Sequence, residues 1–142
     1  MRTNADLPYM TTCYKVVRAC SNGRLYSVSA EGHNALRYFK TRWTKAKVGG
    51  ILVFSDPVRA RNYARMGDAV YECQCKRPVK LPRYRFLLLG LNSASPEQIA
   101  KLWSIRRYSR KCEKLLTVHA GWLPGTLAFK EIKLTKLLSK PL

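Results

Sequence analysis

The stretch "CYKVVRACSNGRLYSVSA", residues 13–30, decides how the fold begins, because it has the pattern of two strands joined by a tight turn. Tyr14 and the two valines that follow, with polar residues around them, suit a β-strand. Asn22-Gly23 is a dipeptide that hairpin turns favour, since both positions tolerate positive φ. The sequence therefore predicts an antiparallel hairpin at the start of the fold.

Further strands are predicted from short apolar runs bounded by turn residues. Residues 34–39 form a candidate strand that leads into a loop over residues 40–50, and "GILVF" is a buried strand. The remaining candidates are "AVYECQCKRPVKLP" (69–82), "RYRFLLLGL" (83–91) and an interrupted strand over residues 127–134.

Two helices have clear start signals. In "SDPVRARNYARMGD" (55–68), Ser55 or Asp56 can cap the helix, a proline occupies the first position, and Gly67 is placed to end it. Its sheet-facing residues should be Val58, Ala60, Tyr63 and Ala64. In "SASPEQIAKLW" (93–103), Ser95 caps before a proline, and the buried stripe should be Ile99, Leu102 and Trp103.

Strands outnumber helices, and neighbouring strands are joined by short turns, so the predicted class is α+β: a mostly antiparallel sheet with two helices in a single domain. We expect residues 1–12 to form a flexible N-terminal segment. They lack the apolar core of a secretory signal, and no apolar run approaches the roughly 20 residues that cross a bilayer. An intracellular location is the expectation, in the cytoplasm or nucleus, with a host cell or a virion as the alternative setting.

Charge is the strongest global signal. Twenty-seven Lys and Arg against eight Asp and Glu give a net charge of +19 in 142 residues. Repulsion of this size disfavours a compact chain unless anions or an acidic partner relieve it. We expect nucleic acid or another polyanion as the partner, with an acidic protein as the alternative.

The cysteines predict a reducing compartment. There are five, with no C-x-x-C pair, which is not a disulfide framework. Cys73 and Cys75 lie two apart on an expected strand, so their side chains share one face, and we expect buried free thiols there. A zinc site would have to recruit His33 or His119 from a distance, and we expect no metal and no cofactor.

Catalytic motifs are missing from the sequence. It contains no G-x-S-x-G, H-E-x-x-H or G-x-x-x-x-G-K-[ST] pattern, and its carboxylates are few. We assign no catalytic residue and expect binding without catalysis.

Two segments interleave aromatic residues with cations, residues 37–47 and 101–114. Nucleic-acid surfaces use cations for phosphates and planar side chains for unpaired bases. The predicted nucleic-acid contacts are Arg42, Trp43, Lys45, Lys47, Arg106, Arg107, Arg110, Lys111 and Lys114, with Trp43 as the stacking candidate. The alternatives are that Tyr38 or Phe39 packs in the core, and that the second segment stabilises a helix C-terminus through its dipole.

Read in order, "YKVVR", "LYS", "GGILVFSDPVRARNYAR", "VYECQCKRP" and "LPGTLAFKEIKL" resemble a loosely defined set of small uncharacterised proteins of large DNA viruses, phages and bacteria. The resemblance covers most of residues 13–135. It implies a shared fold and a viral type of protein, and it implies no activity.

The order of elements from Arg18 to Cys75 is also similar to ADP-ribosyltransferase-like domains. This resemblance would give Arg18 and Tyr63 two of the family's positions. The family's glutamate, often within E-x-E, has no clear counterpart, since Glu131 lies in "FKEIKL". A divergent enzyme of that kind remains an alternative to binding alone.

Overall fold

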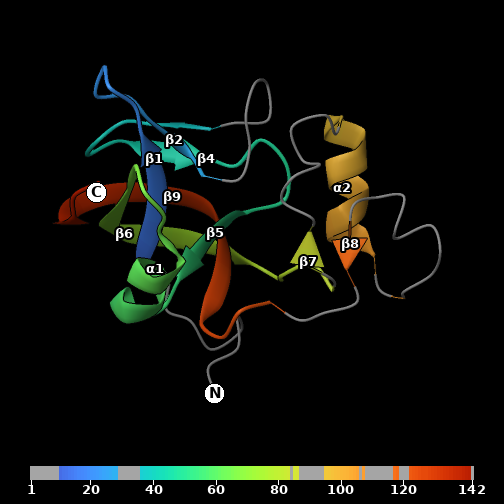
Figure 1. Ribbon diagram of the computed structural model, residues 1–142. Coiled ribbons are helices and arrows are strands. Elements are labelled where there is room, and N and C mark those ends of the chain that lie inside the picture. The colour runs from blue at the N-terminus through green and yellow to red at the C-terminus, as the bar shows by residue number, and fades with distance from the viewer. Residues whose placement is uncertain are drawn as a thin grey trace.

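The fold was obtained as a computed structural model that describes residues 10–28, 36–83, 85–86, 95–105, 107, 117–118 and 122–141 (Figure 1). In chain order its elements are β1 (Met10–Ala19), β2 (Leu25–Ser27), β3 (Arg37–Tyr38), β4 (Trp43–Lys45), β5 (Ile51–Phe54), α1 (Pro57–Tyr63), β6 (Asp68–Val79), β7 (Arg85–Phe86), α2 (Pro96–Ser104), β8 (Thr117–Val118) and β9 (Thr126–Ser139). The predicted α+β class, a mostly antiparallel sheet with two helices, is confirmed.

One seven-stranded sheet contains β1 to β6 and β9, and all its neighbours are antiparallel. β6 pairs with β1 on one side and with β9 on the other. β5 joins the same two strands from the opposite side, so the pairings run from β1 through β5, β9 and β6 back to β1. The sheet therefore closes into a small barrel, extended by β2 and β3 beyond β1 and by β4 beyond β9.

The barrel closes through the fewest paired residues between β1 and β5. The two strands share a single residue pair, Tyr14 with Phe54, whereas β1 and β6 pair from Met10 with Lys76 to Arg18 with Asp68. We call this place the β1–β5 seam. It matters because strand edges that part leave backbone groups without ladder partners.

The barrel interior is filled by alternate residues of the long strands. Cys13 and Val17 of β1 face it together with Cys73 of β6 and Phe129 of β9, and all four are fully buried. Because side chains alternate between the two faces of a strand, Val16 points outward instead, into a second cluster beneath α1.

α1 begins where the sequence predicts. The Asp56 carboxylate accepts hydrogen bonds from the backbone N–H of Val58 (2.7 Å) and of Arg59 (3.4 Å), and Pro57 occupies the first position. Ala60 is buried against the sheet as expected, but Val58 is 58% exposed, so its predicted sheet-facing position is wrong. The helix is only seven residues long, and it packs against the sheet through Ala60 and Tyr63.

The predicted end of α1 at Gly67 is also wrong. The helix ends at Tyr63, and Ala64 takes an extended conformation as its C-cap. Gly67, with φ +88°, lies in the following turn, where the Asp68 N–H donates to the Arg65 carbonyl (2.9 Å). The glycine thus serves the turn into β6 instead of the helix terminus.

α2 also begins as predicted. The Ser95 hydroxyl accepts from the Gln98 N–H (3.2 Å), and the Ser95 N–H donates to the Gln98 side chain (2.8 Å), which completes a capping box. Leu102 is buried in a small cluster with Trp103 and Trp122. In Figure 1, α2 and the β7–β8 pair lie to the right of the sheet, and α1 lies below it, against β1 and β5.

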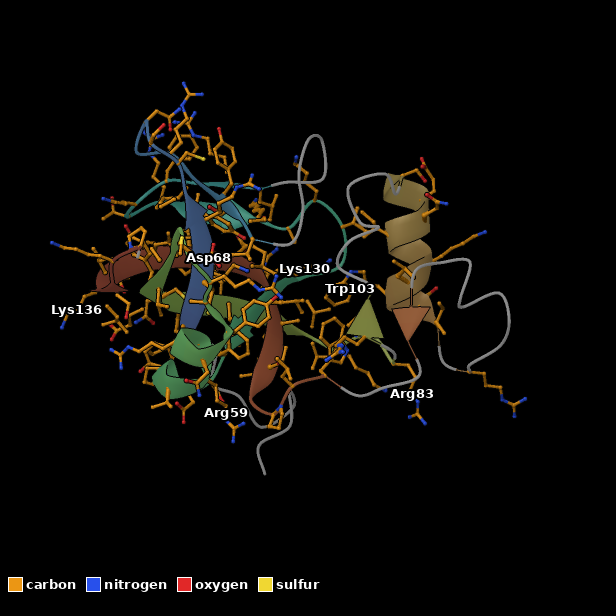
Figure 2. All side chains as sticks on the ribbon, in the orientation of Figure 1. Arg59, Asp68, Arg83, Trp103, Lys130 and Lys136 are labelled. Atoms are coloured by element: carbon orange, nitrogen blue, oxygen red, sulfur yellow. The ribbon has the colours of Figure 1, made fainter. Side chains whose placement is uncertain are left out.

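The two glycines before β5 explain how α2 meets the barrel. Gly49 has φ +63°, and a Cβ at this position would overlap the Trp103 indole. A Cβ at Gly50 would lie 3.4 Å from the same ring. Figure 2 shows Trp103 reaching from α2 toward the sheet. The Gly-Gly pair therefore forms the flat backbone surface on which this tryptophan packs.

Three segments differ from the sequence expectation. Met10–Thr12 belong to β1 instead of a flexible segment, because they pair with β6, and residues 1–9 lie outside the described residues. The expected loop over residues 40–50 contains β4, which pairs with β9. The closing strand is continuous over Thr126–Ser139, without the expected interruption.

Only part of two other predicted strands can be compared. In the 34–39 strand, Arg37 and Tyr38 are confirmed as β3. In the 83–91 strand, Arg85 and Phe86 are confirmed as β7, and residues 84 and 87–91 lie outside the described part of the chain. No helix among the described residues is long and apolar enough to cross a membrane.

The packing of Trp103 on Gly49 predicts an unequal response of two glycines. Gly49→Ala and Gly23→Ala both place a side chain at positive φ, which costs about 1–2 kcal/mol. Only Gly49→Ala also collides with Trp103, so its loss in the free energy of unfolding should be larger by about 1–3 kcal/mol. Urea denaturation of the two variants and the wild type measures this.

A double variant makes the assignment specific. In a Trp103→Ala background, Gly49→Ala should cost no more than Gly23→Ala, because the colliding ring is gone. Equal losses for the two glycine variants in the wild-type background would contradict the packing of Trp103 on this backbone.

Candidate polyanion-binding sites

The structure describes five of the nine predicted contact residues. Arg42, Trp43, Lys45 and Lys47 lie in or beside β4, and Arg107 is exposed after α2. The other predicted contacts lie outside the described residues: Arg106, Arg110, Lys111 and Lys114. The role of these four residues as contacts thus stays a prediction.

Trp43 is held in a strand and surrounded by lysines. It pairs with Lys133 of β9, the Lys133 Nζ lies 5.2 Å from the indole centroid, and the Lys76 Nζ of β6 lies 4.1 Å from it. The expected loop would have left the ring more open. Cation–π contacts with two ammonium groups place the tryptophan within a charged patch.

Phe39 makes a second aromatic–cation group, which we call the Phe39 cluster (Arg37, Phe39 and Arg42). The guanidinium carbons of Arg37 and Arg42 lie 4.4 Å and 5.7 Å from the Phe39 centroid. Phe39 is 42% exposed, while its neighbour Tyr38 is buried in the barrel. The alternative that one of the two rings packs in the core therefore holds for Tyr38, and Phe39 is the more accessible ring.

Three of the described carboxylates already have partners within the fold. Glu131 is buried and forms ion pairs with Lys76 (4.0 Å) and Arg77 (3.4 Å). Asp56 caps α1, and Asp68 accepts a hydrogen bond from the Arg65 backbone N–H (2.9 Å). These acidic groups stabilise the fold, so the excess of positive charge is left for the surface.

A cavity of about 700 Å³ opens at the β1–β5 seam. Four cationic side chains line it: Lys15 of β1, Arg59 of α1, Arg65 after α1 and Arg85 of β7. No carboxylate belongs to its described lining. A concave site with this charge attracts anions.

Arg59 reaches the cavity rim because the turn before β9 has no side chain there. Its Nη1 donates to the Pro124 carbonyl (3.3 Å), and a Cβ at Gly125 would lie 2.8 Å from its Cδ. Gly125 has φ +82°, as the turn requires. The Pro-Gly turn thus both makes the bend and gives room to the arginine stem.

Aromatic rings line the same cavity. Phe54 and Tyr63 pack with their ring centroids 5.3 Å apart, and the Trp122 Nε1 donates to the Pro82 carbonyl (2.8 Å). Burial raises the pKa of the Tyr63 hydroxyl, the positive charges of Arg65 and Arg85 act in the opposite direction, and the negative charge of Asp68 raises it further. These arginines are therefore close enough to Tyr63 to act on the same space.

Lys15 is the most unusual member of the lining. It shares the interior-facing side of β1 with Cys13 and Val17, and its Nζ donates to the Leu52 carbonyl of β5 (2.7 Å). The ammonium also lies 5.7 Å from the Tyr38 ring centroid. Burial lowers the pKa of Lys15 from 10.5 to about 8.

The interior thiols sit beside Lys15. The Sγ atoms of Cys73 and Cys75 are 3.6 Å apart, and both residues are buried and free, as the sequence predicts. Hydrogen bonding with Cys13 and then with Cys73, followed by burial, raises the pKa of the Cys75 thiol. Within the described ranges, no group of three His, Cys, Asp or Glu side chains could hold a metal ion.

Of the residues of the second resemblance, only Tyr63 lines the cavity. Tyr63 lines the cavity, whereas Arg18 lies over the Tyr26 ring (5.8 Å) and Glu131 pairs with Lys76 and Arg77. Neither Arg18 nor Glu131 belongs to the described cavity lining. The described cavity lining therefore does not unite the positions that this resemblance would use.

Comparison with known proteins adds no assignment, because no family model, curated protein or solved structure matches the chain.

The lowered pKa of Lys15 predicts a pH-dependent difference between the wild type and Lys15→Met. Below about pH 8 the lysine is charged in both the folded and unfolded states, and the fold bears the full cost of burying the charge. Between about pH 8 and 10.5 the folded protein has released this proton while the unfolded chain still binds it, so the cost falls as the pH rises.

Relative to Lys15→Met, the wild type should therefore gain about 3 kcal/mol in the free energy of unfolding between pH 7 and 10.5. Urea denaturation of both proteins across this range measures the difference and cancels the titration of the thiols and tyrosines. A difference that does not change with pH would show that Lys15 has its ordinary pKa.

Proposed function

We propose that this protein binds a polyanion, and nucleic acid in particular, without catalysing a reaction. The observation that carries the proposal is the Phe39 cluster, an exposed aromatic ring with two guanidinium groups against it. Proteins that bind single strands combine planar side chains, on which bases stack, with cations that contact the phosphates.

The neighbouring strand supports the same reading. Trp43 follows Arg42 directly in the chain, and the ammonium groups of Lys76 and Lys133 lie over its ring, so the same segment carries a second aromatic–cation group. Thr41 links this segment to β9, since its N–H donates to the Leu134 carbonyl (3.1 Å). The segment is thus supported by the barrel, which lowers the entropy cost of ordering it on binding.

The net charge of +19 supplies the long-range attraction. The exposed Arg107 and the remaining predicted cations of the 101–114 segment are proposed as further phosphate contacts. The free thiols support an intracellular location, which we propose together with the viral type suggested by the resemblance.

Binding to a fluorescently labelled single-stranded oligonucleotide tests the proposal by anisotropy at several salt concentrations. The affinity should fall steeply with salt, with a slope of about 0.7 per neutralised phosphate on logarithmic axes. Arg37→Gln combined with Arg42→Gln should reduce that slope by about 1 and weaken binding. Phe39→Ala should weaken binding by about 1–3 kcal/mol without changing the slope, because stacking is lost and no charge is removed.

Arg83→Gln is the matched control, since Arg83 is exposed and Figure 2 shows it pointing away from the sheet. Its effect should be smaller than that of either cluster variant. The proposal fails if binding is insensitive to salt, or if Arg83→Gln weakens it as much as the double arginine variant.

A further inference from the structure

We propose that the cavity at the β1–β5 seam is a binding site for a nucleoside phosphate, either free or at the end of a nucleic-acid strand. The inference does not depend on the Phe39 cluster, because none of that cluster's residues lines the cavity.

The charge of the lining selects an anion. Lys15, Arg59, Arg65 and Arg85 come from different segments and converge on one space of about 700 Å³. Asp56 caps α1, and Asp68, whose charge acts on Tyr63 of the lining, accepts a hydrogen bond from the Arg65 backbone N–H in the turn before β6. Guanidinium groups are well suited to phosphate, since their planar fork of donors matches its oxygens.

The rest of the lining favours a ligand that also has a planar, partly apolar group. Tyr63 and Trp122 present aromatic rings, and Val16, Val28 and Leu52 add an apolar wall. Pockets for small ligands combine such walls with a few convergent polar groups, and their usual volumes of about 300–1,000 Å³ include this one. A sugar phosphate without a base would leave the aromatic wall unused.

The site is also held in place before any ligand arrives. Arg59 donates to the Pro124 carbonyl, and Trp122 donates to the Pro82 carbonyl. Lys15 is tied to Leu52 across the seam. Side chains that are ordered in advance lose less entropy on binding, so these contacts favour a small ligand.

Isothermal titration calorimetry with adenosine monophosphate, adenosine, glycerol phosphate and inorganic phosphate tests the proposal. Adenosine monophosphate should bind saturably, at least about tenfold more tightly than each of the other three, because only it uses both the cations and the aromatic wall. Binding of adenosine or glycerol phosphate with equal affinity would overturn the proposal, as would no detectable binding of the monophosphate.

Variants locate the site. Arg65→Gln and Arg85→Gln should each weaken adenosine monophosphate binding by about tenfold, the value of one charge-assisted contact. Arg24→Gln is the matched control, because Arg24 is exposed in the β1–β2 turn and does not line the cavity, and it should leave binding unchanged. Unchanged unfolding midpoints show that the variants fold. If both cavity variants bind as the wild type does, the cavity is not the site.

Competition then identifies the source of the ligand. An oligonucleotide with a 5′-phosphate displaces adenosine monophosphate if the site takes a strand end, whereas its 5′-hydroxyl counterpart does not. If neither displaces it, the site takes the free nucleotide. The two proposals can be tested separately. If the Arg37/Arg42 double variant loses oligonucleotide binding and keeps adenosine monophosphate binding, the polyanion surface and the cavity are separate sites.

Discussion

The hydrogen bond from Lys15 to the Leu52 carbonyl joins β1 to β5 where the barrel has its shortest strand pairing, and both residues line the cavity. β1 and β5 share one residue pair, and beyond it their backbones part. A carbonyl at such an edge would be left without a ladder partner, and Lys15 supplies the donor from inside the barrel. Burying the ammonium group there has a free-energy cost, and this cost lowers the pKa of the lysine.

The seam also sets the position of the proposed anion site. Because β1 and β5 separate there, the space between them is walled by α1 on one side and by the turn before β9 on the other. Arg59 and Arg65 enter it from the helix side, and Arg85 from β7. A protein with a net charge of +19 thus concentrates part of its repulsion at one concave place, where a bound anion would relieve it.

Local signals in the sequence predicted the elements well, and the contacts between distant elements much less well. Asp56 and Ser95 were predictable as helix caps because capping depends on residues within one turn. The cavity was not predictable, since Arg85 and Lys15 meet only through the pairing of strands far apart in the chain. The role of Gly49 was equally hidden, because it depends on a tryptophan more than fifty residues away.

One signal for the seam was present in the sequence. Lys15 stands between Cys13 and Val17 on the face of β1 that alternation assigns to the core, and a lysine in such a row indicates a buried role. The Phe39 cluster was partly visible in the same way, since alternation places Arg37 and Phe39 on one face. Trp43 was assigned to a loop because its short strand gains stability only from pairing with β9.

Anions should bind at particular places on this barrel, and the net charge alone should not explain their binding. Amide chemical-shift mapping by NMR, with a short single-stranded oligonucleotide at moderate salt, tests it most directly. Saturable shifts should be largest for residues 37–45 with the oligonucleotide and, in a parallel titration with adenosine monophosphate, for the cavity lining in α1 and residues 122–126. Small shifts spread evenly over all exposed lysines and arginines, or shifts centred on the β1–β2 turn, would contradict it.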